Sequence, residues 1–190
     1  MNCFLDEGSD TTYANEDVIE ALGIRAPKEQ VTINVANNQK VHLMAATVEV
    51  GIESIDGKVQ TSIVVKTSDK ICGGMKTTNW VEIQHQWDHL KDVPFPKLEQ
   101  KGVINVLLGS DYYNLMFPMR EIRGKEDEPS ARLCPLRWTA IGRIGKSELR
   151  PQSANASYLH TFRAQLASPD MLPTILEANE ADLNTTLKRF

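Results

Sequence analysis

The residues best suited to chemistry stand near the start of the chain, where the apolar stretch 3–5 ends at Asp6, Glu7, Gly8 and Ser9. A strand that delivers an aspartate into a glycine turn can hold the carboxylate where it acts as a general acid or base. A polar surface turn accounts for so short a motif equally well. The motif therefore raises the question of whether the strand exists to position Asp6.

A second apolar stretch, 103–108, ends in the same manner at Leu108 and Gly109. In an aspartic peptidase two such strands cross to support the catalytic aspartate, and a glycine lets the backbones approach closely. Either motif alone is weak evidence. Together, with a hairpin between them, they favour a site built around one carboxylate.

Metal-based chemistry is not predicted. A calcium loop starting at Asp6 needs an oxygen ligand at its third position and glycine at its sixth, but the chain has Gly8 and Thr11 there. His85 and His89 have the spacing of a zinc-binding helix, yet the glutamate that should follow the first histidine is missing. We interpret this pair as lying on a helix surface, and we expect neither a metal nor a cofactor.

The cysteines and the composition bear on the compartment of the protein and on the classes of ligand that it binds. The three cysteines are far apart and form no C-x-x-C pair, which is typical of reduced thiols in a cytoplasmic, intracellular protein. Cys72 or Cys134 as a nucleophile would need a histidine placed beside it by the fold. The net charge of -4 argues against nucleic acid as a ligand. No stretch approaches the about 18 apolar residues of a membrane span.

The length of 190 residues with 41% hydrophobic residues predicts one main domain. Alternation of apolar and polar residues predicts two β-hairpins, and one short helix precedes them. The expected elements are a strand over 3–5, a helix over 18–22 ending at Gly23, hairpins 31–35/40–44 and 47–52/59–65, a strand over 103–108, a helix beginning at 112–116 and a last strand within 131–144. Residues 68–102 are predicted to be an insertion with one short helix.

The chain resembles the retropepsin-like aspartic peptidases of Bel/Pao-type retrotransposon polyproteins. The resemblance rests on four segments that occur in the family's order and cover roughly residues 3–145. They are LDEGSDTTY with the following ALGI, WDHLKD at 87–92, INVLLGSDYYNLM at 104–116 and RLCPLRWTAIGRIG at 132–145. The resemblance implies a mainly β fold, a closed barrel with one or two short helices, and a linker and partly helical tail over 146–190 that leads toward a following polyprotein domain.

The resemblance also assigns roles to residues. Asp6 is the catalytic aspartate, and Glu7, Gly8, Ser9, Leu108 and Gly109 support the active-site loop. The flap that closes over the substrate has its tip at Ala36, Asn37, Asn38 and Gln39. Because each chain supplies one aspartate, the resemblance implies that activity requires a homodimer, whose two carboxylates share a proton and activate a water. The substrate is a peptide or polyprotein.

The sequence departs from the family in two places. Glu7 stands where aspartic peptidases usually have serine or threonine, whose hydroxyl braces the two active-site loops. The strand that usually precedes the aspartate's strand is expected to be missing, which predicts an unpaired sheet edge. Two alternatives to an active peptidase therefore stay open: a catalytically inactive, domesticated or truncated module that binds peptides or partners in the same groove, and an interaction scaffold that works through residues 146–190.

Overall fold

The computed structural model describes residues 1–34, 38–72, 77–98, 102–144 and the backbone of 161–167, and within them the fold is mainly β. The strands are β1 (Asn2–Leu5), β2 (Tyr13–Asn15), β3 (Lys28–Asn34), β4 (Lys40–Ser54), β5 (Gln60–Ser68), β6 (Val106–Leu108), β7 (Arg120–Ile122), β8 (Ser130–Cys134), β9 (Arg137–Ile141) and β10 (Thr161–Ala167). The short helices are α1 (Glu16–Ala21), α2 (Trp80–Ile83) and α3 (Tyr113–Met116), with 3₁₀ turns η1 (Gln84–Gln86), η2 (Asp88–Leu90) and η3 (Ser110–Tyr112).

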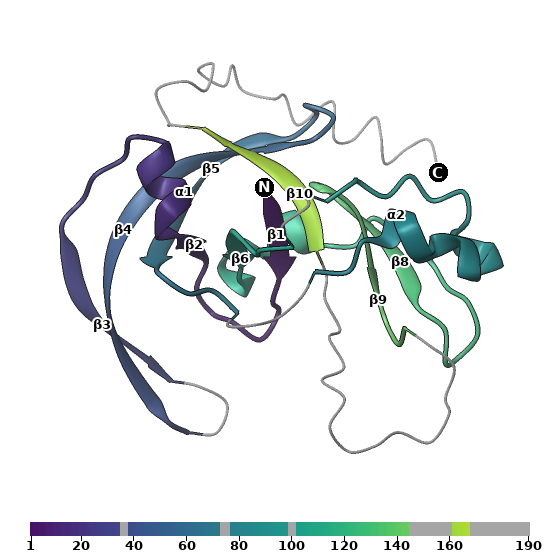
Figure 1. Ribbon diagram of the computed structural model, residues 1–190, viewed down its shortest axis with the longest axis horizontal. Coiled ribbons are helices and arrows are strands. Elements are labelled where there is room, and N and C mark those ends of the chain that lie inside the picture. The colour runs from purple at the N-terminus through teal and green to yellow at the C-terminus, as the bar shows by residue number, and fades with distance from the viewer. Residues whose placement is uncertain (35–37, 73–76, 99–101, 145–160, 168–190) are drawn as a thin grey trace.

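Seven strands form one sheet in the order β10-β1-β6-β2-β5-β4-β3. At its centre β1 runs parallel to β6, and β2 runs antiparallel to β6 and parallel to β5. Strand β10 pairs with β1 on one side and with β4 on the other. The stretches predicted as strands at 3–5 and 103–108 are therefore neighbours in space (Figure 1).

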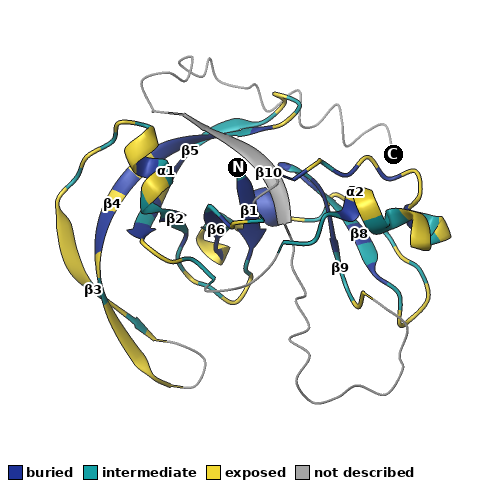
Figure 2. Cartoon of the chain, viewed as in Figure 1, coloured by how far each residue is buried: buried dark blue, intermediate teal, exposed yellow. Residues whose placement is uncertain are grey.

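Burial on both faces explains why β1 and β6 lack an alternating pattern. All four residues of β1 are buried (Figure 2). Val106 and Leu108 of β6 are buried as well. Strands covered on both faces read as continuous apolar runs. The central strands are therefore anchored by their own side chains, and the loops that follow them start from a rigid base.

Strand β4 belongs to both predicted hairpins. Its first part pairs with β3 and its second part with β5, so the strands predicted at 40–44 and 47–52 are one continuous strand of 15 residues. The first part is mostly exposed and the second mostly buried. In Figure 1 the outer end of the β3–β4 hairpin curves away from the core of the sheet.

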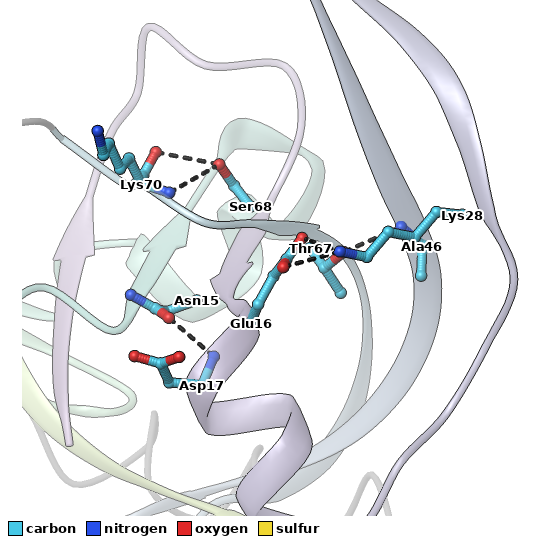
Figure 3. Close-up of polar contacts among 8 residues, drawn as sticks. All are labelled: Asn15, Glu16, Asp17, Lys28, Ala46, Thr67, Ser68 and Lys70. Carbon is cyan, nitrogen blue, oxygen red and sulfur yellow. Dashed lines mark hydrogen bonds and ion pairs between the residues drawn. The ribbon is translucent and has the colours of Figure 1, made fainter.

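Helix α1 begins two residues before the stretch predicted from periodicity. The side chain of Asn15 caps it by accepting a hydrogen bond of 2.9 Å from the backbone N–H of Asp17. Gly23, with φ of +74°, follows its end, as a glycine after a helix commonly does. Glu16 forms an ion pair with Lys28 at 2.8 Å, which ties the helix to the start of β3 (Figure 3).

The region 120–141 forms a separate three-stranded sheet in the order β7-β8-β9. The single strand expected within 131–144 was wrong, because β8 and β9 form a hairpin that turns at Pro135 and Leu136. Proline has no N–H for a ladder hydrogen bond and interrupts the strand. The insertion packs against this sheet, with Trp80, Leu90 and Phe95 in a second apolar cluster that includes Trp138.

The tail also differs from its prediction. Within 146–190 the sequence predicted a linker and a helix, but Thr161–Ala167 form β10, which pairs with β1 from Asn2 to Phe4. The edge of β1 that was expected to be unpaired is thus occupied by a strand from the other end of the chain. Residues 171–187, where the helix was predicted, lie outside the described residues. Among the described helices, none has the length and apolar character to cross a bilayer.

Candidate functional site

The site is built where β1 and β6 end together. Leu5 lies opposite Leu108 in the parallel register, and the backbone N–H of Asp6 donates a hydrogen bond of 3.0 Å to the carbonyl oxygen of Leu108. Asp6 therefore leaves the sheet directly beside Gly109. The structure brings together the two motifs from which the sequence predicted a site.

The loop after β1 binds the carboxylate of Asp6 with its own backbone. The N–H of Gly8 donates to the carboxylate oxygen Oδ1 of Asp6 at 3.0 Å. The N–H of Ser9 donates to the backbone carbonyl oxygen of Asp6 at 3.2 Å. A Cβ on Gly8 would lie 3.2 Å from the same Oδ1. The side chain of Asp6 is thus held in a turn and remains partly accessible to solvent.

The second loop touches the first through Gly109 and Ser110. Both the N–H and the hydroxyl of Ser110 donate to the carbonyl oxygen of Ser9 at 2.8 Å. A Cβ on Gly109 would lie only 2.7 Å from the carbonyl oxygen of Thr11, so no other residue fits without backbone movement. The glycine is required by close approach, because its φ of -91° is one that any residue adopts.

Thr12 and Asp111 join the two loops, although neither was predicted to be a site residue. Thr12 is fully buried; its hydroxyl donates to Oδ1 of Asp111 at 2.6 Å, and its N–H donates to Oδ2 at 3.0 Å. The same hydroxyl accepts a 2.9 Å hydrogen bond from the N–H of Gly109. Both residues lie within the recognised segments, but only the fold shows that they meet.

Glu7 points toward the three-stranded sheet. Its side chain is 61% exposed, and its Oε1 lies 3.4 Å from Nη1 of Arg132 on β8. Arg132 also binds Glu121 on β7, with 2.9 Å between Nε and Oε1. Glu7, which was predicted to support the active-site loop, therefore contacts a strand for which no site residue was predicted.

A cleft of about 670 Å³ opens at Asp6. The first loop forms one side of it, the β3–β4 hairpin another, and the segment after β5 a third. Its lining comprises Asp6, Gly8, Ser9, Asp10, Tyr13, Ile33, Asn34, Val41, Leu43, Ser68, Lys70, Ile71, Cys72 and Leu107. The predicted flap hairpin thus faces the same space as the carboxylate, through residues away from its tip.

The flap tip itself is only partly described. Ala36 and Asn37 lie outside the described residues. Asn38 has φ of +62°, a left-handed conformation that asparagine tolerates in turns, and Gln39 leads into β4. Neither Asn38 nor Gln39 lines the cleft.

The thiols near the site are poor nucleophiles. Burial, together with the nearby charge of Asp6, raises the pKa of Cys72 to about 11. Burial likewise raises the pKa of Cys134 to about 11, and its Sγ donates to the carbonyl oxygen of Met116 at 3.1 Å. Since the thiolate is the reactive form, neither cysteine is activated for catalysis at neutral pH.

His85 and His89 were expected to lie on one helix, but they lie in two separate turns. His85 lies in η1 and His89 in η2, and a ring nitrogen of His89 lies 2.8 Å from the carbonyl oxygen of Pro129. The chain bends between the two turns, so their helical spacing is lost. In the described part of the chain, no three histidine, cysteine or acidic side chains are grouped as a metal site would require.

A second cavity, of about 870 Å³, lies between α1 and the inner part of β4 and β5. Buried Ala46 and Thr67 form its floor, joined by a 2.9 Å hydrogen bond from the Ala46 N–H to the Thr67 hydroxyl (Figure 3). Asp6 is not among its lining residues.

Comparisons of the chain with protein-family models, with curated proteins and with solved structures found no match.

Proposed function

We propose that the chain is a retropepsin-like aspartic endopeptidase that hydrolyses peptide bonds in a retrotransposon polyprotein. The observation that carries the proposal is the N–H of Asp6 bound to the carbonyl oxygen of Leu108 at the shared end of two parallel strands. This geometry supports a carboxylate held at the crossing of two loops. The pairing of β10 with both β1 and β4 supports the closed barrel that such peptidases have.

The catalytic group is completed by a second copy of the chain. Asp6 is one carboxylate, and the reaction needs two that share a proton. In the homodimer one Asp6 takes a proton from a water, which attacks the scissile carbonyl, while the other donates a proton to the carbonyl oxygen. The tetrahedral intermediate then breaks to release an amine and a carboxylic acid.

The substrate is an extended peptide in the cleft at Asp6. Ile33, Val41 and Leu43 of the hairpin supply apolar contacts above it, and Leu107 supplies one beside the carboxylate. Closure of the hairpin excludes water from the reacting groups. An extended peptide binds such a groove mainly through its backbone hydrogen bonds.

The test is cleavage of a peptide library by the purified chain, followed across pH. We expect an acidic optimum, loss of cleavage in Asp6→Asn, and retention of cleavage in Asp10→Asn, a matched change in the same cleft. A variant Asp6→Asn that cleaves as fast as the wild type would overturn the proposal.

A second candidate is a peptide-binding module without activity. The exposed Glu7 favours it, because a carboxylate replaces the hydroxyl that braces active-site loops in such enzymes. For this candidate we expect the wild type to cleave no peptide of the library, and Asp6→Asn to bind the same peptides as the wild type with unchanged affinity.

A further inference from the structure

Arg132 of the three-stranded sheet reaches the active-site loop. Arg132 on β8 lies 3.4 Å from Glu7, which directly follows Asp6. The two residues are 125 positions apart in the sequence. The contact therefore couples the β7–β9 sheet to the loop that carries the proposed catalytic aspartate.

Arg132 is fixed in place by a second carboxylate. It lies opposite Glu121 in the register of β7 and β8, and its Nε binds Oε1 of Glu121 at 2.9 Å. Glu121 also binds Arg123. The hydrogen bond from Arg123, together with Arg132, lowers the pKa of Glu121. With Nε bound to Glu121, the planar guanidinium presents Nη1 to Glu7.

Glu7 carries a second carboxylate, one residue along the chain from the proposed catalytic one. Two carboxylates close together compete for protons, since each disfavours ionisation of the other. Glu121 is another acidic group on this side, and the Cys134 thiol is close enough to interact with Glu7. A dimer that joins two copies of Asp6 also brings two copies of Glu7 toward the same place. Arginine stays charged throughout the working pH range, so each chain carries its own counter-ion.

We propose that Arg132 is a positioning residue, which holds the Glu7 carboxylate toward the three-stranded sheet so that the shared proton stays with the Asp6 pair. This inference rests on the proposed function for its consequence, but the contact itself is independent of it. A partly exposed ion pair contributes little to stability. The main effect is therefore expected on the pH dependence of cleavage, with only a small coupling between the two residues in stability.

The experiment compares kcat/KM across pH for Arg132→Gln and for Arg123→Gln, which removes an arginine from Glu121 without touching Glu7. We expect Arg132→Gln to move both limbs of the profile to higher pH and to lower cleavage at the wild-type optimum about tenfold, the effect of a shift of about one pH unit. Arg123→Gln leaves the profile unchanged. The double variant Glu7→Gln/Arg132→Gln restores the wild-type limbs, because the unpaired charge is gone.

An unchanged profile in Arg132→Gln, or a double variant that keeps the shift, overturns the inference. A readout without activity separates this failure from failure of the proposed function. Melting temperatures of the wild type, Glu7→Gln, Arg132→Gln and the double variant form a cycle, in which a contact produces non-additive shifts. Non-additivity in a chain that cleaves nothing supports the contact and rejects the peptidase, whereas additive shifts reject the contact.

Discussion

The hydroxyl of the fully buried Thr12 donates a 2.6 Å hydrogen bond to Asp111 and accepts one of 2.9 Å from the N–H of Gly109. One side chain therefore joins the loop after β1 to the loop after β6. The carboxylate of Asp111 completes the connection by accepting from the N–H of Thr12. The relative position of the two loops, and with it that of Asp6, depends on this pair.

Replacing Thr12 by valine keeps the shape of the side chain and removes its hydroxyl. The N–H of Gly109 then stays buried without a partner, which costs about 1–3 kcal/mol. We expect Thr12→Val to lower the free energy of unfolding by about that amount and to reduce cleavage, while Thr12→Ser retains most of both. Urea denaturation of the two variants measures the difference. Equal stability of the valine variant and the wild type would contradict the role given to the hydroxyl.

Gly109→Ala places a methyl group against backbone. Its Cβ would lie 2.7 Å from the oxygen and 2.8 Å from the carbon of the Thr11 carbonyl, so the two loops must separate. We expect a loss of about 1–3 kcal/mol, typical of overpacking, and a loss of cleavage.

Gly23→Ala is the matched control, because its Cβ meets nothing within 4 Å and only its φ of +74° is unfavourable. That change costs about 1–2 kcal/mol and leaves cleavage per folded molecule unchanged. Thermal unfolding and peptide cleavage on both variants separate the two effects. A Gly109→Ala chain with wild-type cleavage would mean that the loops do not need to touch.

The Cys72 thiol reports on Asp6 without any need for activity. Its pKa is raised to about 11, by burial and then by the charge of Asp6. At pH 7 the thiol is protonated, so alkylation is slow and speeds up as pH rises toward 11. Asp6→Asn removes one cause of the shift, so we expect faster alkylation of Cys72 at pH 8 to 9. Mass spectrometry of the Cys72 peptide measures the rate, and an unchanged rate would place Asp6 away from the thiol.

The sequence allowed the two strand ends at the candidate site to be identified, because local pattern and fold agree there. The ends of the strands at Leu5 and Leu108 could be recognised from apolar runs followed by Asp6 and Gly109, since the signal lies within a few neighbouring residues. The residues that connect these two segments could not be recognised from the sequence. Thr12 and Asp111 look like ordinary polar loop residues until the loops are brought together.

Long-range pairing explains the remaining differences. The stretch 161–167 alternates polar and apolar residues as a strand does, but nothing local indicates that β1 and β4 are its partners. Arg132 lies in the segment RLCPLRW, and its contact with Glu7 depends on how the β8–β9 hairpin packs. Pro135 is a local signal for the β8–β9 turn, but the prediction of one continuous strand did not take it into account.

Asp56 connects the two sheets and should make stability depend on pH. The carboxylate accepts from the Ser54 hydroxyl at 2.7 Å and binds Arg137 of β9 at 2.8 Å. Burial alone would raise its pKa, but the Ser54 hydrogen bond and then Arg137 lower it below the ordinary value of 3.8. A carboxyl with a lowered folded-state pKa stabilises the fold above its ordinary pKa, and this contribution is lost as pH falls through the folded-state value. We therefore expect Asp56→Asn to cost about 1 kcal/mol at pH 7 and much less at pH 2.

Urea denaturation of the wild type and of Asp56→Asn at the two pH values gives the comparison. Asp69→Asn is a suitable control, because Asp69 is an exposed aspartate at the end of β5. The wild type should lose more stability than Asp56→Asn between pH 7 and pH 2, because only the wild type has this carboxylate to protonate. Parallel losses in the two chains would show that the Asp56–Arg137 pair does not hold the three-stranded sheet against the main sheet. Arg132 and Arg137 belong to the same β8–β9 hairpin. If the Asp56–Arg137 pair does not hold this hairpin in place, another contact must keep Arg132 within reach of Glu7.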